Sequence, residues 1–177
     1  MNSNSNKISW NLYLKKLMGT LEKGRKKTIM RRNRRQPNRL DLRGEISNHI
    51  AKIVVAIDIS GSISDEEFNV AINEVINIVK NYKYEIKIIE CDTKIRRIYK
   101  AKNSKDIKAR LNTRGGTRFS PVFKYVNNTD TNVLIYFTDG KGEVELEVKP
   151  GKYKTLWIIS GKANEVSLRN KFGVIKN

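Results

Sequence analysis

Residues 53–62 read IVVAIDISGS, five apolar residues followed by an aspartate and, after one isoleucine, two serines around a glycine. A β-branched run without polar alternation is typical of a strand buried on both faces of a parallel sheet. The residues that follow, Ser64–Asn81, carry apolar side chains at helical spacing and three acids in the first turn. A buried strand followed by an amphipathic helix predicts the start of an α/β domain.

The same alternation continues to the end of the chain. The charged run 94–99 (KIRRIY) is typical of an edge strand, Ser104–Leu111 is expected to be a helix capped by Ser104, and Pro121 is expected in the first turn of another helix. Further strands are expected at 86–89, 133–137, 155–160 and 172–176. We therefore predict an α/β fold in which a doubly wound, mostly parallel sheet is flanked by helices, preceded by a basic N-terminal helical arm.

The net charge of +18 is concentrated at the N-terminus. Residues 1–43 hold thirteen Lys and Arg against Glu22 and Asp41, which makes this segment +11 and leaves +7 for the remainder. We predict a basic arm over 1–43 and an α/β domain over 44–177. The arm begins with an amphipathic helix that needs a surface to cover, followed by a charged stretch from Gly24 to Leu40 that we interpret as an extended linker. The apolar face of the helix comprises Trp10, Leu14, Leu17, Met18 and Leu21.

Two roles remain open for the arm. It could pack on the domain, which the apolar helix face favours, or it could bind nucleic acid, since its cations could neutralise many phosphates. Against nucleic acid, the only aromatic residues of the arm, Trp10 and Tyr13, lie in the helix and not among the arginines. The candidate nucleic-acid-binding residues are Arg25, Lys26, Lys27, Arg31, Arg32, Arg34 and Arg35.

Three short motifs are expected to meet at one edge of the sheet. Asp58-Ile59-Ser60-Gly61-Ser62 follows the first strand, Gly115-Gly116-Thr117 precedes a helix, and Thr138-Asp139-Gly140 follows the strand 133–137. Ligands of such sheets bind at the carboxyl ends of the strands. Hydroxyl and carboxylate oxygens suit Mg²⁺ or Mn²⁺, and the motifs contain no histidine or thiol that would favour zinc or copper. The predicted metal ligands are Asp58, Ser60, Ser62, Thr117 and Asp139.

These five residues resemble the metal-ion-dependent adhesion site (MIDAS) of von Willebrand factor A (VWA) domains, which have a Rossmann-like fold. DISGS matches the DxSxS pattern of the family, and Thr117 and Asp139 match its later threonine and aspartate. The resemblance implies that Ser60, Ser62 and Thr117 ligate the metal directly, with the two aspartates often acting through water. It also implies that a protein partner supplies an acidic residue to the metal.

A longer resemblance runs from Trp10 through RRNRRQPNRLDLRG to TLWIIS at 155–160. It is to the C-terminal, VWA-like half of bacterial proteins assigned as metallopeptidases, often encoded beside MoxR-type AAA+ ATPases. The upstream half of those proteins carries an HExxH zinc motif, whereas this chain has one histidine, His49, and no such motif. We therefore expect no enzymatic activity and no catalytic residues.

The sequence thus favours a non-catalytic, metal-dependent protein-binding module, and an adaptor for an AAA+ ATPase is one form of it. The alternatives are a nucleic-acid-binding protein acting through the arm, or the C-terminal part of a split metallopeptidase. The sequence has no apolar stretch long enough for a membrane span, no apolar signal core at its start, and a single cysteine, Cys91, which we expect to be a small buried residue. We expect a cytoplasmic protein.

Overall fold

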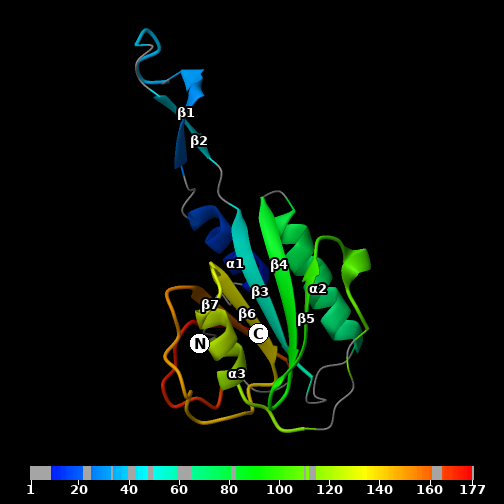
Figure 1. Cartoon of the computed structure of the whole chain (residues 1–177). Helices are drawn as coiled ribbons and strands as arrows, with labels where there is room; N and C mark the ends of the chain where they lie inside the picture. The colour runs from blue at the N-terminus through cyan, green and yellow to red at the C-terminus, as the bar shows by residue number, and fades with distance from the viewer. Residues whose placement is uncertain are drawn as a thin grey trace, which may run out of the picture.

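The computed structural model describes most of the chain and resolves its core as a layered α/β domain (Figure 1). The described residues are 9–21, 25–32, 34–39, 43–47, 50–59, 65–80, 83–109, 111, 115–160 and 165–176. None of the helices in these ranges has the length and apolar content needed to cross a bilayer.

A six-stranded sheet forms the centre of the domain, in the order β5-β4-β3-β6-β7-β8. All neighbouring strands are parallel except β4 and β5, which are antiparallel. This confirms the predicted doubly wound, mostly parallel sheet with a charged strand at its edge. The strands are β3 (Ala51–Asp58), β4 (Tyr84–Cys91), β5 (Ile95–Ala101), β6 (Val133–Thr138), β7 (Lys154–Ile159) and β8 (Val174–Lys176).

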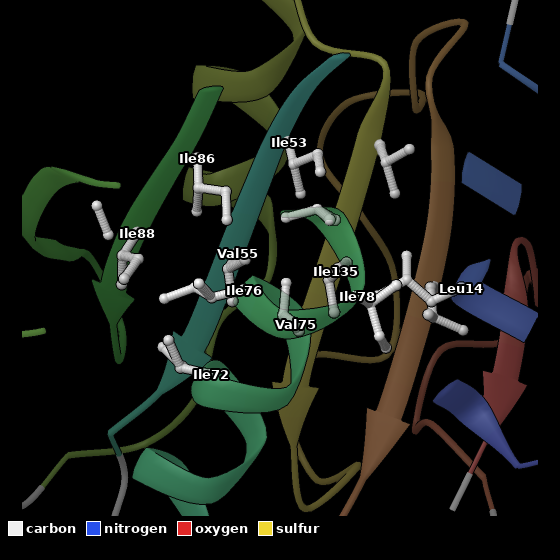
Figure 2. Packing of buried hydrophobic residues seen from close by; sticks show 14 of the residues in the cluster. Leu14, Ile53, Val55, Ile72, Val75, Ile76, Ile78, Ile86, Ile88 and Ile135 are labelled. Carbon is white, nitrogen blue, oxygen red and sulfur yellow. The ribbon is translucent and has the colours of Figure 1, made fainter. Parts of the chain in front are cut away.

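Helices cover both faces of the sheet, which is why the central strands lack polar alternation. On one face, Ile53, Val55 and Ile57 of β3 pack with α1 (Trp10–Thr20) and α2 (Asp65–Val79), as Figure 2 shows for part of this core. On the other face, Val54 and Ala56 pack with α3 (Ser120–Asn127). Successive side chains of a strand point to opposite faces, so both sets are buried.

The two cores differ in composition. The face beneath α1 and α2 is mostly aliphatic, with Leu14 of α1 fully buried among isoleucines and valines. The face beneath α3 contains stacked aromatic rings, with Tyr136 and Trp157 at 5.0 Å between ring centroids and both rings in contact with Phe123. The burial of Leu14 confirms that the predicted amphipathic helix of the arm packs on the domain.

The charged stretch after α1 is not an extended linker, so that interpretation was wrong for 25–32. These residues form β1 (Arg25–Arg32), which pairs in an antiparallel hairpin with β2 (Arg43–Ser47) as a separate two-stranded sheet. Interstrand pairing across a long connection is hard to predict because the strand 25–32 is mostly cationic and shows no apolar alternation. The boundary that we placed after residue 43 falls within β2.

A second expectation was also wrong. Only Ser104–Asp106 is helical, as a single 3-10 turn (η1), and the cap is Asn103 instead of Ser104. The Asp106 carboxylate accepts the backbone N–H groups of Lys102 and Asn103, and Ile107 is already extended. The capping interactions therefore close one turn, and the chain leaves the helical conformation at once.

Candidate metal centre

Asp58 is the last residue of β3 and lies at the carboxyl end of the central strand, with 1% of its surface exposed. Its Oδ2 atom accepts hydrogen bonds from the Thr117 hydroxyl at 2.9 Å and from the Thr138 hydroxyl at 3.0 Å. A buried carboxylate is stable only where its oxygens are partnered, so these two hydroxyls help to keep it in place. The structure thus joins two of the five predicted site residues directly.

Thr138 was not among the predicted site residues. β3 pairs with β6 up to Ile57 and Phe137, so the next residues, Asp58 and Thr138, come side by side. The Thr138 hydroxyl donates to Asp58 and accepts the backbone N–H of Gly140 at 3.1 Å. It therefore links the carboxylate to the loop that carries Asp139. In the sequence, Thr138 is visible only as a polar residue after the apolar run 133–137. Its contact with Asp58 follows from the strand register, which the sequence does not give.

Asp139 follows β6 and is half-buried. Its Oδ1 atom accepts the backbone N–H of Lys141 at 2.9 Å, which fixes the side chain against its own loop. Gly140 adopts a φ of +81°, and a side chain there would come within 2.4 Å of the Glu165 carbonyl oxygen. Only glycine fits this turn, which places Asp139 at the same edge of the sheet as Asp58.

The loop 115–118 carries Thr117, and the buried residue Asp92 supports it. The backbone carbonyl of Asp92 accepts the Arg118 N–H at 3.0 Å, and a side chain on Gly115 would lie 3.2 Å from the Asp92 carboxylate. Arg96 binds that carboxylate through Nε and Nη2, at 2.8 and 2.7 Å from Oδ2. Asp92 therefore stabilises the loop that carries Thr117.

The glycines of this loop make room for Asp92. Within the described part of the chain only Gly140 and Gly173 have a positive φ, so Gly115 and Gly116 need no left-handed backbone conformation. A side chain on Gly115 would instead approach Asp92. The Asp92 side chain also accepts the Lys94 N–H at 3.0 Å, which closes the turn that leads into β5.

Ser60 and Ser62, the other two predicted ligands, lie outside the described residues, as does His49. Of the candidate nucleic-acid contacts, Arg25, Lys26, Lys27 and Arg31 lie in β1, and the structure describes only the backbone of these four. Arg32, Arg34 and Arg35 are exposed.

Cys91 pairs with Asp58 in the sheet register but faces the aromatic core. Its thiol contacts the Tyr136 hydroxyl at 3.2 Å and the Ile57 carbonyl at 3.3 Å. Burial raises the pKa of the Cys91 thiol to about 12 and raises that of the Tyr136 hydroxyl well above 10. The thiol is protonated and shielded at neutral pH, which confirms the expectation of a small buried residue.

The described part of the site fits a hard divalent cation by its donor chemistry. A hydroxyl has one proton to donate and two lone pairs with which to accept. Because Thr117 gives its proton to Asp58, its lone pairs remain for a cation on the other side of the oxygen. Carboxylates at Asp58 and Asp139 supply negative charge, as oxygen-only ligation of Mg²⁺ requires.

Residues 53–175 match the family model described as "VWA-like domain (DUF2201)", and the chain belongs to this family. It is also 24% identical, over 164 residues, to an uncharacterised protein of Thermotoga maritima, a match that covers 92% of this chain. The chain spans 40% of the length of that relative.

Two solved structures match part of this chain. One is an aerotolerance-related membrane protein from Bacteroides fragilis, 11% identical, with a TM-score of 0.45 over 62% of this chain and 67% of the other. The second is the ArnB paralog VWA2 from Sulfolobus acidocaldarius, 20% identical, with a TM-score of 0.47 over 63% of this chain and 35% of the other.

Proposed function

We propose that this VWA-like domain is a non-catalytic protein-binding module whose binding depends on a divalent metal ion. The observation that carries the proposal is the convergence of the Thr117 and Thr138 hydroxyls on the buried carboxylate of Asp58. The arrangement presents oxygen donors at the carboxyl edge of a parallel sheet, where doubly wound folds bind their ligands. The proposed ligands of Mg²⁺ or Mn²⁺ are Asp58, Ser60, Ser62, Thr117 and Asp139.

Each described residue has a distinct task in this proposal. Thr117 offers its oxygen to the metal while its proton is held by Asp58 at 2.9 Å, and Thr138 fixes the same carboxylate from the neighbouring strand. Interactions of this kind orient ligands and commonly change metal affinity tenfold or more. Asp139 adds a second negative charge from a loop whose shape depends on Gly140. The bound ion would supply a Lewis-acidic centre for a carboxylate of the partner.

VWA domains commonly mediate protein interactions, and this chain carries the donor set for a metal-dependent one. We propose a cytoplasmic partner that presents an acidic residue, and an AAA+ ATPase of the MoxR type is the candidate that the sequence resemblance favours. The Thermotoga maritima relative is longer, and this chain matches 40% of it.

The first test is metal titration into the whole chain by calorimetry. Asp58→Asn, Asp58→Ala and Ser60→Ala should each weaken Mg²⁺ binding strongly, because each removes a proposed ligand. Asp130→Ala is the matched control, since Asp130 is an exposed carboxylate paired with Lys52 at 2.5 Å at the opposite end of the sheet. Thermal unfolding without metal establishes that each variant is folded. Undiminished binding in all three site variants would refute the metal centre.

The second test addresses the partner and the lack of catalysis. Tagged wild-type protein should retain an acidic partner in Mg²⁺ and release it in EDTA, whereas Asp58→Asn should fail to retain it in either condition. The purified chain should not cleave unfolded protein with or without zinc. Metal-dependent cleavage that disappears in Asp139→Ala would show that the chain is an enzyme and would contradict the proposal.

A further inference from the structure

The β1–β2 hairpin contains a dense block of positively charged residues. Residues 25–39 contain eight Lys and Arg and no Asp or Glu. This stretch comprises all of β1 and the connection as far as Arg39, while Asp41 lies in the last part of the connection and Glu45 lies in β2. The cations are Arg25, Lys26, Lys27, Arg31, Arg32, Arg34, Arg35 and Arg39.

A defined turn lies in the connection between the strands. The Arg39 N–H donates to the Gln36 carbonyl at 3.2 Å, so residues 36–39 form a turn with Pro37 and Asn38 at its centre. Exposed arginines lie on both sides of the turn, at Arg34 and Arg35 before it and at Arg39 after it. The turn therefore gathers guanidinium groups at one end of a two-stranded ribbon.

The ribbon projects from the body at the end of the sheet opposite to Asp58 (Figure 1). Helix α1 ends at Thr20 before the hairpin, and β3 begins at Ala51 after it. The seven residue steps from Ala51 to Asp58 separate the two ends by about 23 Å at the rise of a β-strand. The basic ribbon and the candidate metal centre are thus separate surfaces.

The edge of the body from which the ribbon projects adds further positive charge. Lys83 precedes β4 and Lys154 begins β7, and both are exposed. The Lys83 carbonyl accepts the Ala51 N–H at 2.8 Å, so this lysine is adjacent to the point where the chain returns from the hairpin. The acids of that edge, Glu85 and Asp130, are ion-paired with lysines.

We propose that the β1–β2 hairpin binds the phosphate backbone of a nucleic-acid duplex, with the lysine-bearing edge of the body as a second contact. A two-stranded ribbon has the dimensions that fit the major groove of B-form DNA, and arginine forms paired hydrogen bonds with the phosphate oxygens of either duplex. Fifteen residues without an acid match a continuous line of phosphates better than the scattered carboxylates of a protein surface.

The composition of the hairpin also favours binding of a duplex over binding of a single strand. Residues 22–50 contain no Phe, Trp or Tyr, so the hairpin has no aromatic platform on which unpaired bases could stack. Contacts confined to phosphates carry no sequence information, so the hairpin binds duplexes of any sequence. DNA and RNA duplexes share this chemistry, and the experiment distinguishes them.

The experiment measures binding of the whole chain to fluorescent DNA and RNA duplexes of matched sequence over a series of salt concentrations. The test variant carries Arg32→Gln, Arg34→Gln, Arg35→Gln and Arg39→Gln, all at exposed positions. The control variant loses the same charge elsewhere on the exposed surface of the body. It carries Lys94→Gln, Lys141→Gln, Arg169→Gln and Lys171→Gln.

Wild type should bind at least one duplex more tightly than the matching single strand and retain binding near physiological salt. The hairpin variant should lose affinity by about tenfold or more, and its slope of log affinity against log salt should fall by about three to four, at roughly 0.9 per lost phosphate contact. The control variant should keep the wild-type slope, and EDTA or Asp58→Asn should leave duplex binding unchanged.

Equal losses in the hairpin and control variants would mean that net charge alone is responsible, which overturns the proposal. Tighter binding to single strands, or displacement of the duplex by polyglutamate at equal charge concentration, would also overturn it, and the second result would assign the hairpin to an acidic protein. Unchanged unfolding temperatures of both variants exclude a folding defect as the cause.

Discussion

Replacing Thr138 by valine tests whether the link between β6 and Asp58 is what organises the site. Valine has nearly the shape of threonine but lacks the hydroxyl that donates to Asp58 and accepts from the Gly140 N–H. Thr138 is fully buried, so water cannot replace either hydrogen bond. Leaving a buried partner unsatisfied costs about 1–3 kcal/mol, which gives roughly 2–6 kcal/mol for the two.

The matched control is Thr138→Ser, which keeps the hydroxyl and removes only a buried methyl group. That loss should cost about 1 kcal/mol. Urea unfolding of the metal-free chain should therefore rank the variants as wild type, serine and valine in decreasing free energy of unfolding. Magnesium should then stabilise wild type and the serine variant, while the valine variant should need a roughly 10–100-fold higher Mg²⁺ concentration for the same gain.

Two results would refute the reasoning. If the valine variant is as stable as the serine variant, the hydroxyl does not hold the Asp58 carboxylate. If it is less stable but binds Mg²⁺ as wild type does, the link has a structural role alone. The metal-free measurement separates these outcomes because it does not depend on the proposed ion.

Three further predictions follow from particular residues. Leu14→Ala should lower the free energy of unfolding by about 2–5 kcal/mol in urea titration, since Leu14 is fully buried in the core beneath α1. A loss below about 1 kcal/mol would mean that α1 is not docked in solution. Gly140→Ala should be destabilising and weaken Mg²⁺ binding together, because a side chain at a φ of +81° meets the Glu165 carbonyl oxygen at 2.4 Å, and a neutral effect on both would refute the turn. Cys91 should resist a thiol reagent at about pH 8 until urea unfolds the chain, since its folded pKa is about 12, and prompt modification of folded protein would contradict its burial.

The raised pKa of Cys91 also fixes the sign of its contribution to stability. The pKa is about 12 in the folded chain against 9.0 for an ordinary thiol. Below pH 9 both states are protonated, so the contribution is fully present there, and it is lost as the pH rises from 9 to 12 because the unfolded chain releases its proton first.

The sheet could be predicted because the composition of its central strands indicates that they are buried. Residues 53–57 and 133–137 are apolar on both faces, and in the structure each face contacts a different core, with α1 and α2 on one side and α3 on the other. The order of the strands was not predictable to the same depth. The order depends on which strands pair with each other. A short apolar strand is compatible with several partners, and tertiary contacts determine which pairing forms.

The candidate site also contains both residues that the sequence identifies and residues that it does not. Asp58, Thr117 and Asp139 follow from motifs whose oxygen chemistry is visible in the sequence. Thr138 and Asp92 do not, because their contacts arise from strand register and from a loop laid over a buried carboxylate. Ligand types can be inferred from local sequence, whereas the residues that orient them are selected by the fold.

The basic hairpin shows where composition misled the interpretation. A charge of +11 over residues 1–43 suggested a single arm, for which packing on the domain and binding of nucleic acid were alternatives, and the apolar face of the helix favoured packing. The structure divides that segment into a helix with a buried Leu14 and a separate two-stranded sheet. Charge alone could not separate the two, because Lys15 and Lys16 are exposed on the packed helix as well.

The packed helix gives the hairpin a fixed base. Because α1 is anchored in the core and β3 is the central strand, both ends of the segment between Thr20 and Ala51 are held by the body of the domain. A tethered ribbon loses less freedom on binding than a loose basic tail does, which favours affinity for the same number of phosphate contacts. The match to the Thermotoga maritima relative covers 92% of the chain and so necessarily reaches into residues 1–43, beyond the 53–175 of the family model. The sequence similarity therefore includes part of the arm as well as the domain, and in this chain the candidate metal centre and the basic ribbon lie at opposite ends of β3.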